Sequence, residues 1–109
     1  MSSFSRSDVI LVRVPFSDLS GSKIRPVVVV SAPHRSQDLF VVGLTSRTSE
    51  LLPGEFVLAD WAATGLNVAT AAKRALFTVH RTLPQKHLGR LSGSDTERLD
   101  QSLRVWLGL

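Results

Sequence analysis

The residues with the clearest chemical potential form a short basic segment near the N-terminus, residues 20–26, with the sequence SGSKIRP. Glycine and serine leave backbone N–H groups open to close approach, and two cationic side chains follow them. Such a segment suits the binding of a phosphate group. Its candidate phosphate-binding residues are Ser20, Gly21, Ser22, Lys23 and Arg25. The alternative is a polar connecting loop whose charges are simply solvated.

A second candidate site follows the apolar segment 39–44. Thr45, Ser46 and Arg47 place two hydroxyl groups and one guanidinium where a buried strand would leave the core. These groups can donate hydrogen bonds to an anion. The alternative is the ordinary polarity of a strand end.

Other catalytic arrangements are missing from the sequence. It has no HExxH motif, no phosphate loop and no G-x-S-x-G elbow, and it contains no cysteine. The carboxylates are scattered, so no strand offers the adjacent pair that a metal-dependent nuclease or a glycosidase needs. His34, His80 and His87 lie in separate segments, where each is more typical of a surface histidine than of a general base. We therefore expect neither a metal nor a cofactor.

The charge of the chain favours an anionic partner. Thirteen Lys and Arg against nine Asp and Glu give a net charge of +4. This surplus suits a nucleic acid or an acidic protein segment, or it serves solubility alone. No run approaches the roughly 18 apolar residues of a membrane span, and the N-terminus lacks the apolar core of a secretory signal. We expect a cytoplasmic protein that does not enter a membrane.

The elements that must position these groups are mostly strands. The length of 109 residues predicts a single domain over residues 1–109. Period-two patterns and β-branched runs predict strands at residues 8–15, 25–31, 39–45, 55–58 and 74–80. The first of these reads as buried on both faces, residues 17–23 as a loop, and residues 60–63 as one helical turn stopped by Gly65. Pro26 is expected at a strand start or on an edge.

One clear helix is predicted, at the C-terminus. Residues 94–97, with the sequence SDTE, have the spacing of a capping box. Leu99, Leu103, Trp106 and Leu107 recur at helical spacing, and Gly108 ends the helix. The fold class expected is therefore α+β, mainly β: a small barrel or sheet with one terminal helix packed on it.

Longer strings of residues resemble a known family. Residues 8–31, DVILVRVPFSDLSGSKIRPVVVVS, resemble the N-terminal signature of the MazF/PemK family of toxin endoribonucleases. The resemblance continues through VVGLTSR at 41–47, DW at 60–61, GL at 65–66, FTVHRTL at 77–83 and LGRL at 88–91. One position departs from the family pattern, because Ser7 stands where the family has a glycine before the first strand.

This resemblance implies a fold, an activity and partners. The fold is a small SH3-like (PemK-like) barrel of mostly antiparallel strands with a C-terminal helix. The activity is metal-independent, sequence-selective cleavage of single-stranded RNA by a homodimer, restrained by a cognate acidic antitoxin in a type II toxin–antitoxin system whose complex binds DNA. Arg25 and Thr45 take the family's catalytic positions. RNA-binding residues would be Ser20, Gly21, Ser22, Lys23, Ser46, Arg47 and Arg81.

The chemistry of the two implied catalytic residues is consistent with this activity. RNA cleavage without a metal uses the 2′-OH of the substrate as nucleophile, so the protein has to move protons and stabilise charge on phosphorus. The fork of Arg25 matches phosphate oxygens, whereas a guanidinium hardly ever loses its proton. Thr45 would donate a hydrogen bond to the same phosphate. The acceptor of the 2′-OH proton stays open, with His80 as one candidate.

Two other functions compete with the endoribonuclease. The first is a non-catalytic protein of the same fold that binds a protein target, as gyrase-poisoning toxins do, or a nucleic acid. The second is a reader of double-stranded DNA, which is weak because no helix-turn-helix or basic recognition helix is visible.

Overall fold

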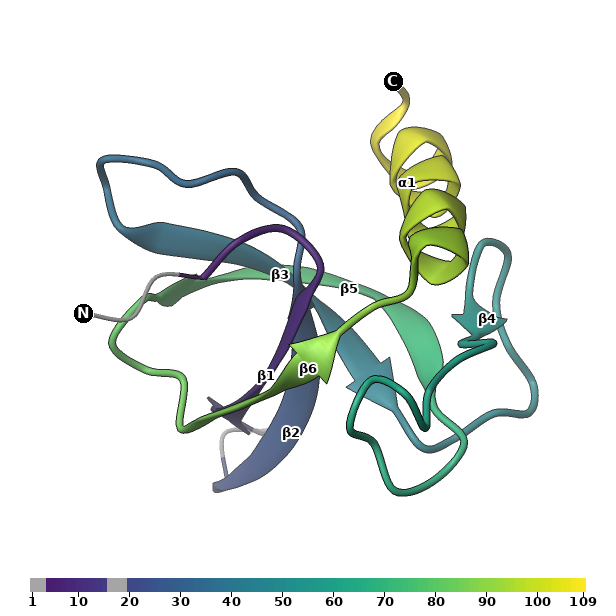
Figure 1. Ribbon diagram of the computed structural model, residues 1–109, viewed down its shortest axis with the longest axis horizontal. Helices are drawn as coiled ribbons and strands as arrows, with labels where there is room; N and C mark the ends of the chain where they lie inside the picture. Colours follow the sequence, from purple (N-terminus) through teal and green to yellow (C-terminus); the bar gives the residue numbers. More distant parts are fainter. Residues whose placement is uncertain (1–3, 16–19) are drawn as a thin grey trace.

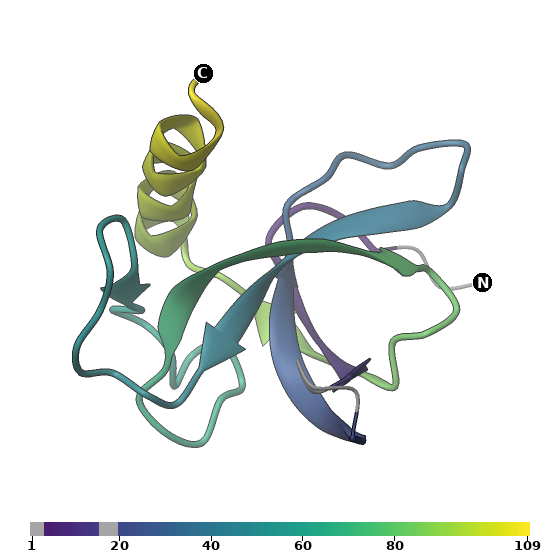
Figure 2. The same cartoon turned by 180° about the vertical axis from the view of Figure 1, so that it is seen from behind.

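The computed structural model describes residues 4–15 and 20–109, and over these residues the chain forms six strands and one helix (Figure 1). The elements are β1 (Asp8–Pro15), β2 (Ser22–Val29), β3 (Asp38–Thr45), β4 (Phe56–Val57), β5 (Ala71–His80), β6 (Lys86–Arg90) and α1 (Gly93–Leu107). The strands form one antiparallel sheet in the order β4-β5-β3-β2-β1-β6. The sheet is strongly curled, and α1 lies at one side of it (Figure 2). The expected mainly-β fold class with one terminal helix is confirmed.

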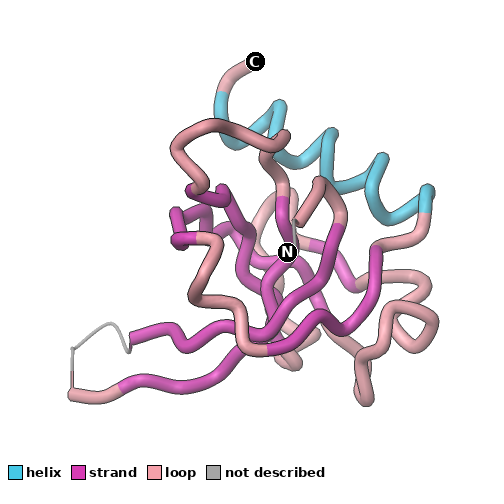
Figure 3. The backbone as a smooth tube through the Cα atoms, turned by 60° about the vertical axis from the view of Figure 1, so that its left-hand side comes forward, coloured by secondary structure: helices cyan, strands magenta, loops and turns pink. Residues whose placement is uncertain are grey.

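The predicted strand bounds are right for β1 and wrong in part for the others. β2 begins at Ser22 rather than near residue 25 and ends at Val29, because residues 22–24 pair with the end of β1. The loop predicted over 17–23 is therefore wrong at Ser22 and Lys23, while residues 16–19 lie outside the described part. The end of β1 and the start of β2 reach beyond the rest of the sheet (Figure 3).

The other strands differ from prediction mainly in length. β3 gains Asp38, and β4 is limited to two residues. β5 begins three residues earlier than predicted, at Ala71. β6 was not predicted, and it pairs with β1 as an edge strand.

Alternation along the strands divides the buried side chains into two clusters. The helix-side cluster includes Val9, Val28 and Val42 from the sheet and Leu99 and Leu103 from α1. The opposite cluster contains Ile10, Val12, Val27, Val29, Leu39, Val41 and Val79. β1 is thus buried on both faces over residues 9–10, as predicted, although Arg13 is exposed near its end. The side chains of neighbouring residues in one strand therefore pack into different clusters, on opposite faces of the sheet.

The C-terminal helix begins two residues earlier than the capping box predicts. Ser92 is the N-cap, and its hydroxyl accepts a hydrogen bond from the backbone N–H of Asp95 at 3.2 Å. Gly108 ends the helix in the left-handed conformation, as predicted. Of the predicted apolar stripe, Leu107 is 51% exposed and does not join the core.

The segment 59–66 forms consecutive hydrogen-bonded turns instead of the predicted helical turn. Asp95, only 1% exposed, holds its start by accepting hydrogen bonds from the backbone N–H groups of Ala59 and Asp60 at 2.9 and 3.0 Å. Its end lies against β6 so closely that a Cβ on Gly89 would stand 2.4 Å from the Thr64 carbonyl oxygen. The helix and β6 therefore fix this turn from two sides.

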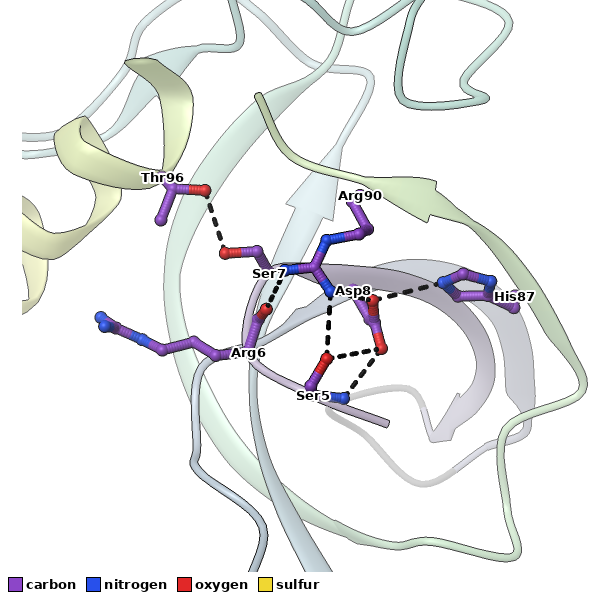
Figure 4. Close-up of polar contacts among 7 residues, drawn as sticks. All are labelled: Ser5, Arg6, Ser7, Asp8, His87, Arg90 and Thr96. Carbon is purple, nitrogen blue, oxygen red and sulfur yellow. Dashed lines mark hydrogen bonds and ion pairs between the residues drawn. The ribbon is translucent and has the colours of Figure 1, made fainter. Parts of the chain in front are cut away.

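A polar cluster joins the N-terminal segment to β6 and α1 (Figure 4). The Asp8 carboxylate, 8% exposed, accepts hydrogen bonds from the Ser5 backbone N–H at 2.8 Å and from Arg90 at 3.0 Å. It also lies 3.4 Å from Nε2 of His87. Ser7 has a positive φ of 81°, the conformation that favours glycine, and its hydroxyl lies 2.9 Å from that of Thr96 on the helix.

None of the helices in the described part of the chain has the length and apolar character needed to cross a membrane.

Candidate active site

The structure brings Arg25 and Thr45 together where β2 and β3 separate. The ladder between these strands pairs Val27 with Gly43, and continuing this register places Arg25 opposite Thr45 just past the last pair. Both residues line one pocket of about 100 Å³. Two residues that are 20 positions apart in the sequence thus meet at one site because of an antiparallel register.

The strands separate here for reasons that the sequence carries. Pro26 has no N–H to donate, and β3 does not pair with β2 at this position, so Pro26 lies on a local edge. The expectation of a strand start or an edge is met only in part, because Pro26 lies inside β2, an interior strand that pairs with β1 here, and only its β3 side is unpaired. On the other side of β3, the one residue between Val42 and Leu44 faces the three residues between Leu76 and Ala72, so β5 bulges opposite Gly43.

The cationic side chains at this site are free to bind a ligand. Arg25 and Lys23 are exposed, and neither side chain has a hydrogen-bond or ion-pair partner within residues 4–15 and 20–109. Both line a second pocket of about 290 Å³, which also contains Thr45 and Ser46. Since unpaired cations repel one another, the site is prepared for an anion.

Lys73 is a further cation that sequence reasoning missed. It lies in the β5 bulge and lines the pocket of Arg25 and Thr45. The strand was predicted to begin at residue 74, which left Lys73 outside it. The bulge that places Lys73 in the same pocket as Thr45 gives no signal in the hydrophobic pattern of the neighbouring residues. A run of two small residues before the lysine, Ala71-Ala72, is the one sequence sign of close packing there.

The polar end of β3 presents its hydroxyl as a donor. Thr45 Oγ1 accepts a hydrogen bond from the backbone N–H of Arg47 at 3.1 Å, which leaves its O–H free to donate. Arg47 lies 2.6 Å from Glu50 in an exposed ion pair. Arg47 and Thr45 both line a third pocket, of about 310 Å³, together with Lys73.

Two acidic residues, Glu50 and Glu55, line this third pocket, and both carboxylates already have partners within the protein. Besides the ion-paired Glu50, Glu55 accepts hydrogen bonds from the backbone N–H of Arg74 at 2.8 Å and of Leu52 at 2.7 Å. These two bonds, Arg74 first, lower the pKa of Glu55 below its ordinary value. A carboxylate held in this way is a weak base.

The remaining predicted site residues lie elsewhere. Ser20 and Gly21 are exposed beyond the start of β2, and the Ser22 hydroxyl accepts a hydrogen bond from Arg13 at 3.2 Å. Arg81 follows β5 at the other end of β3, and seven residue steps of about 3.3 Å place that end at most about 23 Å from Thr45 along the strand.

No histidine lines the three pockets around Thr45 in the described part of the chain. His80 pairs with Asp38 at the far end of the sheet, and its Nδ1 accepts the backbone N–H of Thr82 at 3.2 Å. His34 binds Ser36 in the same way, and His87 lies beside Asp8. Within residues 4–15 and 20–109, no three acidic or histidine side chains gather closely enough to hold a metal ion.

Comparison with known proteins gives a family and a set of similar folds. A model of the family described as "PemK-like, MazF-like toxin of type II toxin-antitoxin system" matches residues 5–107. A comparison with curated proteins gave no match.

Several solved structures share the fold at low sequence identity. One is an endoribonuclease in complex with its cognate antitoxin from a mycobacterial species, with a TM-score of 0.78, 17% identity, and coverage of 98% of this chain and 97% of that one. Another is MazE–MazF (Form-II) from Deinococcus radiodurans, with a TM-score of 0.78, 13% identity, and coverage of 100% and 99%. The Mycobacterium tuberculosis toxin MazF-mt6 gives a TM-score of 0.67, 17% identity, and coverage of 92% and 97%.

Proposed function

The chain belongs to the family of PemK-like, MazF-like toxins of type II toxin–antitoxin systems, and we propose that it is an endoribonuclease that cleaves single-stranded RNA sequence-selectively. Proteins of the same fold include one described as an endoribonuclease in complex with its antitoxin. The observation that carries the proposal is the meeting of Arg25 and Thr45 in one pocket, beside cations that have no partner in the described part of the chain.

The reaction uses the substrate as its own nucleophile. The 2′-oxygen attacks the neighbouring phosphorus, the bond from phosphorus to the 5′-oxygen breaks, and the products end in a 2′,3′-cyclic phosphate and a 5′-hydroxyl. Arg25 holds two phosphate oxygens with its fork and stabilises the negative charge that builds up in the transition state. Thr45 donates its free O–H to the same phosphate. The atoms balance without a co-reactant.

The route of the proton follows from the groups available. The lysines and arginines around Thr45 are donors, Glu55 is engaged with two backbone N–H groups, and the histidines lie elsewhere. We infer that the 2′-OH loses its proton to solvent in a rapid equilibrium before the attack, and that a water molecule gives a proton to the leaving 5′-oxygen. This replaces His80, the candidate considered from the sequence. Without a side-chain base, log kcat/KM should rise steadily between pH 5 and 8, with no plateau near the ordinary histidine pKa.

The test is cleavage of a long RNA in the presence of EDTA by purified protein and its variants. Arg25→Ala should lower kcat/KM about a hundredfold or more, as loss of a charge-assisted transition-state contact does. Arg25→Lys should be nearly as inactive, because it keeps the charge and loses the fork. Thr45→Val deletes only the hydroxyl and should reduce the rate less.

A matched control separates the site from the general charge of the surface. Arg104 is exposed on α1, away from the pockets of Thr45, so Arg104→Ala should cleave at the wild-type rate. Intact RNA at high protein concentration would favour the non-catalytic alternative. Near-normal cleavage by Arg25→Ala with an unchanged melting temperature would remove Arg25 from the mechanism.

The partners and location form part of the same proposal. The chain acts in the cytoplasm as a homodimer, and an acidic antitoxin segment covers Lys23, Arg25 and Lys73 and thereby excludes RNA. Light scattering at micromolar concentration should give the mass of a dimer. A toxin–antitoxin complex that still cleaves RNA at the rate of the free protein would refute competition for this surface.

A further inference from the structure

A fourth pocket, which has polar and charged walls, lies at the opposite end of β3 from Thr45. The proposed chemistry does not use it. It has a volume of about 260 Å³. Its lining residues are Phe4, Pro33, His34, Gln37, Asp38, Leu39 and Arg81. Figure 1 shows the start of β3 beside the 31–37 loop, whereas the end of β3 lies beside the 59–66 turn.

Arg81 is held in this pocket by an unusual backbone conformation. Gln37 has a positive φ of 66°, which is rare for a residue other than glycine. Its carbonyl accepts the backbone N–H of Arg81 at 3.0 Å, and its side-chain oxygen accepts Arg81 Nε at 2.8 Å. The guanidinium is thereby oriented, while its two terminal nitrogens have no partner among the described residues. Strained, well-held residues of this kind are common at binding sites.

Asp38 adds an acceptor to the same pocket. Its carboxylate forms no ion pair with Arg81, and within residues 4–15 and 20–109 it has no hydrogen-bond partner. Two opposite charges that line one pocket and do not pair with each other can bind one ligand that carries both donors and acceptors. A phosphate would satisfy Arg81 and be repelled by Asp38, so the ligand is not a simple anion.

Both pockets adjoin the same face of the sheet. Phe4 and Leu39 border the Arg81 pocket, whereas Val27 and Phe77 border the pocket of Arg25 and Thr45. All four side chains belong to or pack against the cluster opposite the helix. One RNA strand can therefore occupy both pockets without crossing an edge of the sheet.

We propose that the Arg81 pocket binds a guanine base of the RNA, several nucleotides from the cleaved bond. Guanine offers the N1–H and N2–H donors to the two oxygens of Asp38, and the O6 and N7 acceptors to the fork of Arg81. Guanine can form two hydrogen bonds with the Asp38 carboxylate and two with the Arg81 guanidinium. Each of the other bases can form a pair of hydrogen bonds with at most one of these two groups. Phe4 and Pro33 supply apolar surface for the ring. The inference rests on the proposed function, since it assigns part of its sequence selectivity.

The first experiment measures selectivity by sequencing the products cleaved from a pool of randomised RNA. The wild-type protein should prefer guanine at one position that does not flank the cut. Asp38→Asn and Arg81→Gln should each reduce that preference between about fivefold and about a hundredfold, and should leave the preferences next to the cut unchanged. Glu97→Gln and Arg104→Gln, which remove exposed charges elsewhere, should change neither. A uniform loss at all sequences, or a preferred base other than guanine, would overturn the assignment.

The second experiment does not need cleavage. Fluorescence anisotropy with 2′-O-methyl RNA, which has no free 2′-OH, should show weaker binding when inosine replaces the selected guanosine, because inosine lacks the N2 amino group. Asp38→Asn should reduce this difference, because it removes the charge and one of the two acceptor oxygens. A protein that cleaves RNA and binds both oligonucleotides equally disproves the guanine pocket alone. A protein that does not cleave and still makes the Asp38-dependent distinction disproves the proposed function alone.

Discussion

Substituting Asp95 with asparagine tests how the helix supports the active-site pocket. The carboxylate is 1% exposed and accepts two backbone N–H groups, one on each oxygen. Asparagine keeps one acceptor and turns an NH₂ group toward the other N–H. The change therefore removes one charge-assisted hydrogen bond and leaves a buried donor unpaired. Each effect is of the order of 1–3 kcal/mol, so we expect a loss of about 2–6 kcal/mol in the free energy of unfolding.

The assay is urea denaturation of Asp95→Asn beside Glu97→Gln, followed by RNA cleavage well below the midpoint. Glu97 lies in the same part of α1, is exposed, and has no partner within residues 4–15 and 20–109. Its substitution controls for the lost charge near the helix N-terminus and should cost less than about 0.5 kcal/mol. Equal stability of the two variants would refute the role given to Asp95. The rate of RNA cleavage should also fall, because Gly65 and Leu66 of the 59–66 turn line the pocket that contains Lys23, Arg25 and Thr45.

Two further changes test other contacts. Gly89→Ala should destabilise the protein by about 2 kcal/mol or more in thermal unfolding, since its Cβ would meet the Thr64 carbonyl, whereas Gly93→Ala, with open space around it, should not destabilise. Glu55→Gln should lower stability more at pH 7 than at pH 3. The backbone N–H of Arg74 stabilises the carboxylate and lowers its pKa, so the stability it contributes is present above about pH 4.5 and is lost as pH falls through the folded-state pKa. An equal difference between wild type and Glu55→Gln at both pH values would contradict this account.

The sequence predicted the elements whose local pattern is strong. β1 is a continuous β-branched run, and α1 repeats leucines at helical spacing, so each was found from its own residues. β6 was missed because KHLGR is short and half-exposed, and it becomes a strand only by pairing with β1. The helix start was misplaced because two serines, Ser92 and Ser94, offer similar caps, and tertiary contacts of Asp95 decide between them.

Several residues of the candidate site could be predicted from the sequence, but their arrangement in space could not. Arg25 and Thr45 stood out as polar groups at strand ends, and the register between β2 and β3 brings them together. Lys73 depends on a bulge, and the Arg81 pocket depends on the left-handed backbone of Gln37. Both of these are set by contacts between distant segments, which local patterns do not encode.

The pairing of β1 with β6 has a consequence for the synthesis of the protein. The first strand finds its outer neighbour only in the last quarter of the chain, and Ser7 is then held by Thr96 on the terminal helix. Pairings so distant in sequence form late and slowly. During translation, β1 must therefore wait until β6 and α1 have left the ribosome before the sheet is complete. Until residue 88 has emerged, the nascent chain also lacks the Leu88 wall of the pocket that contains Lys23 and Arg25, so this pocket is completed only near the end of synthesis.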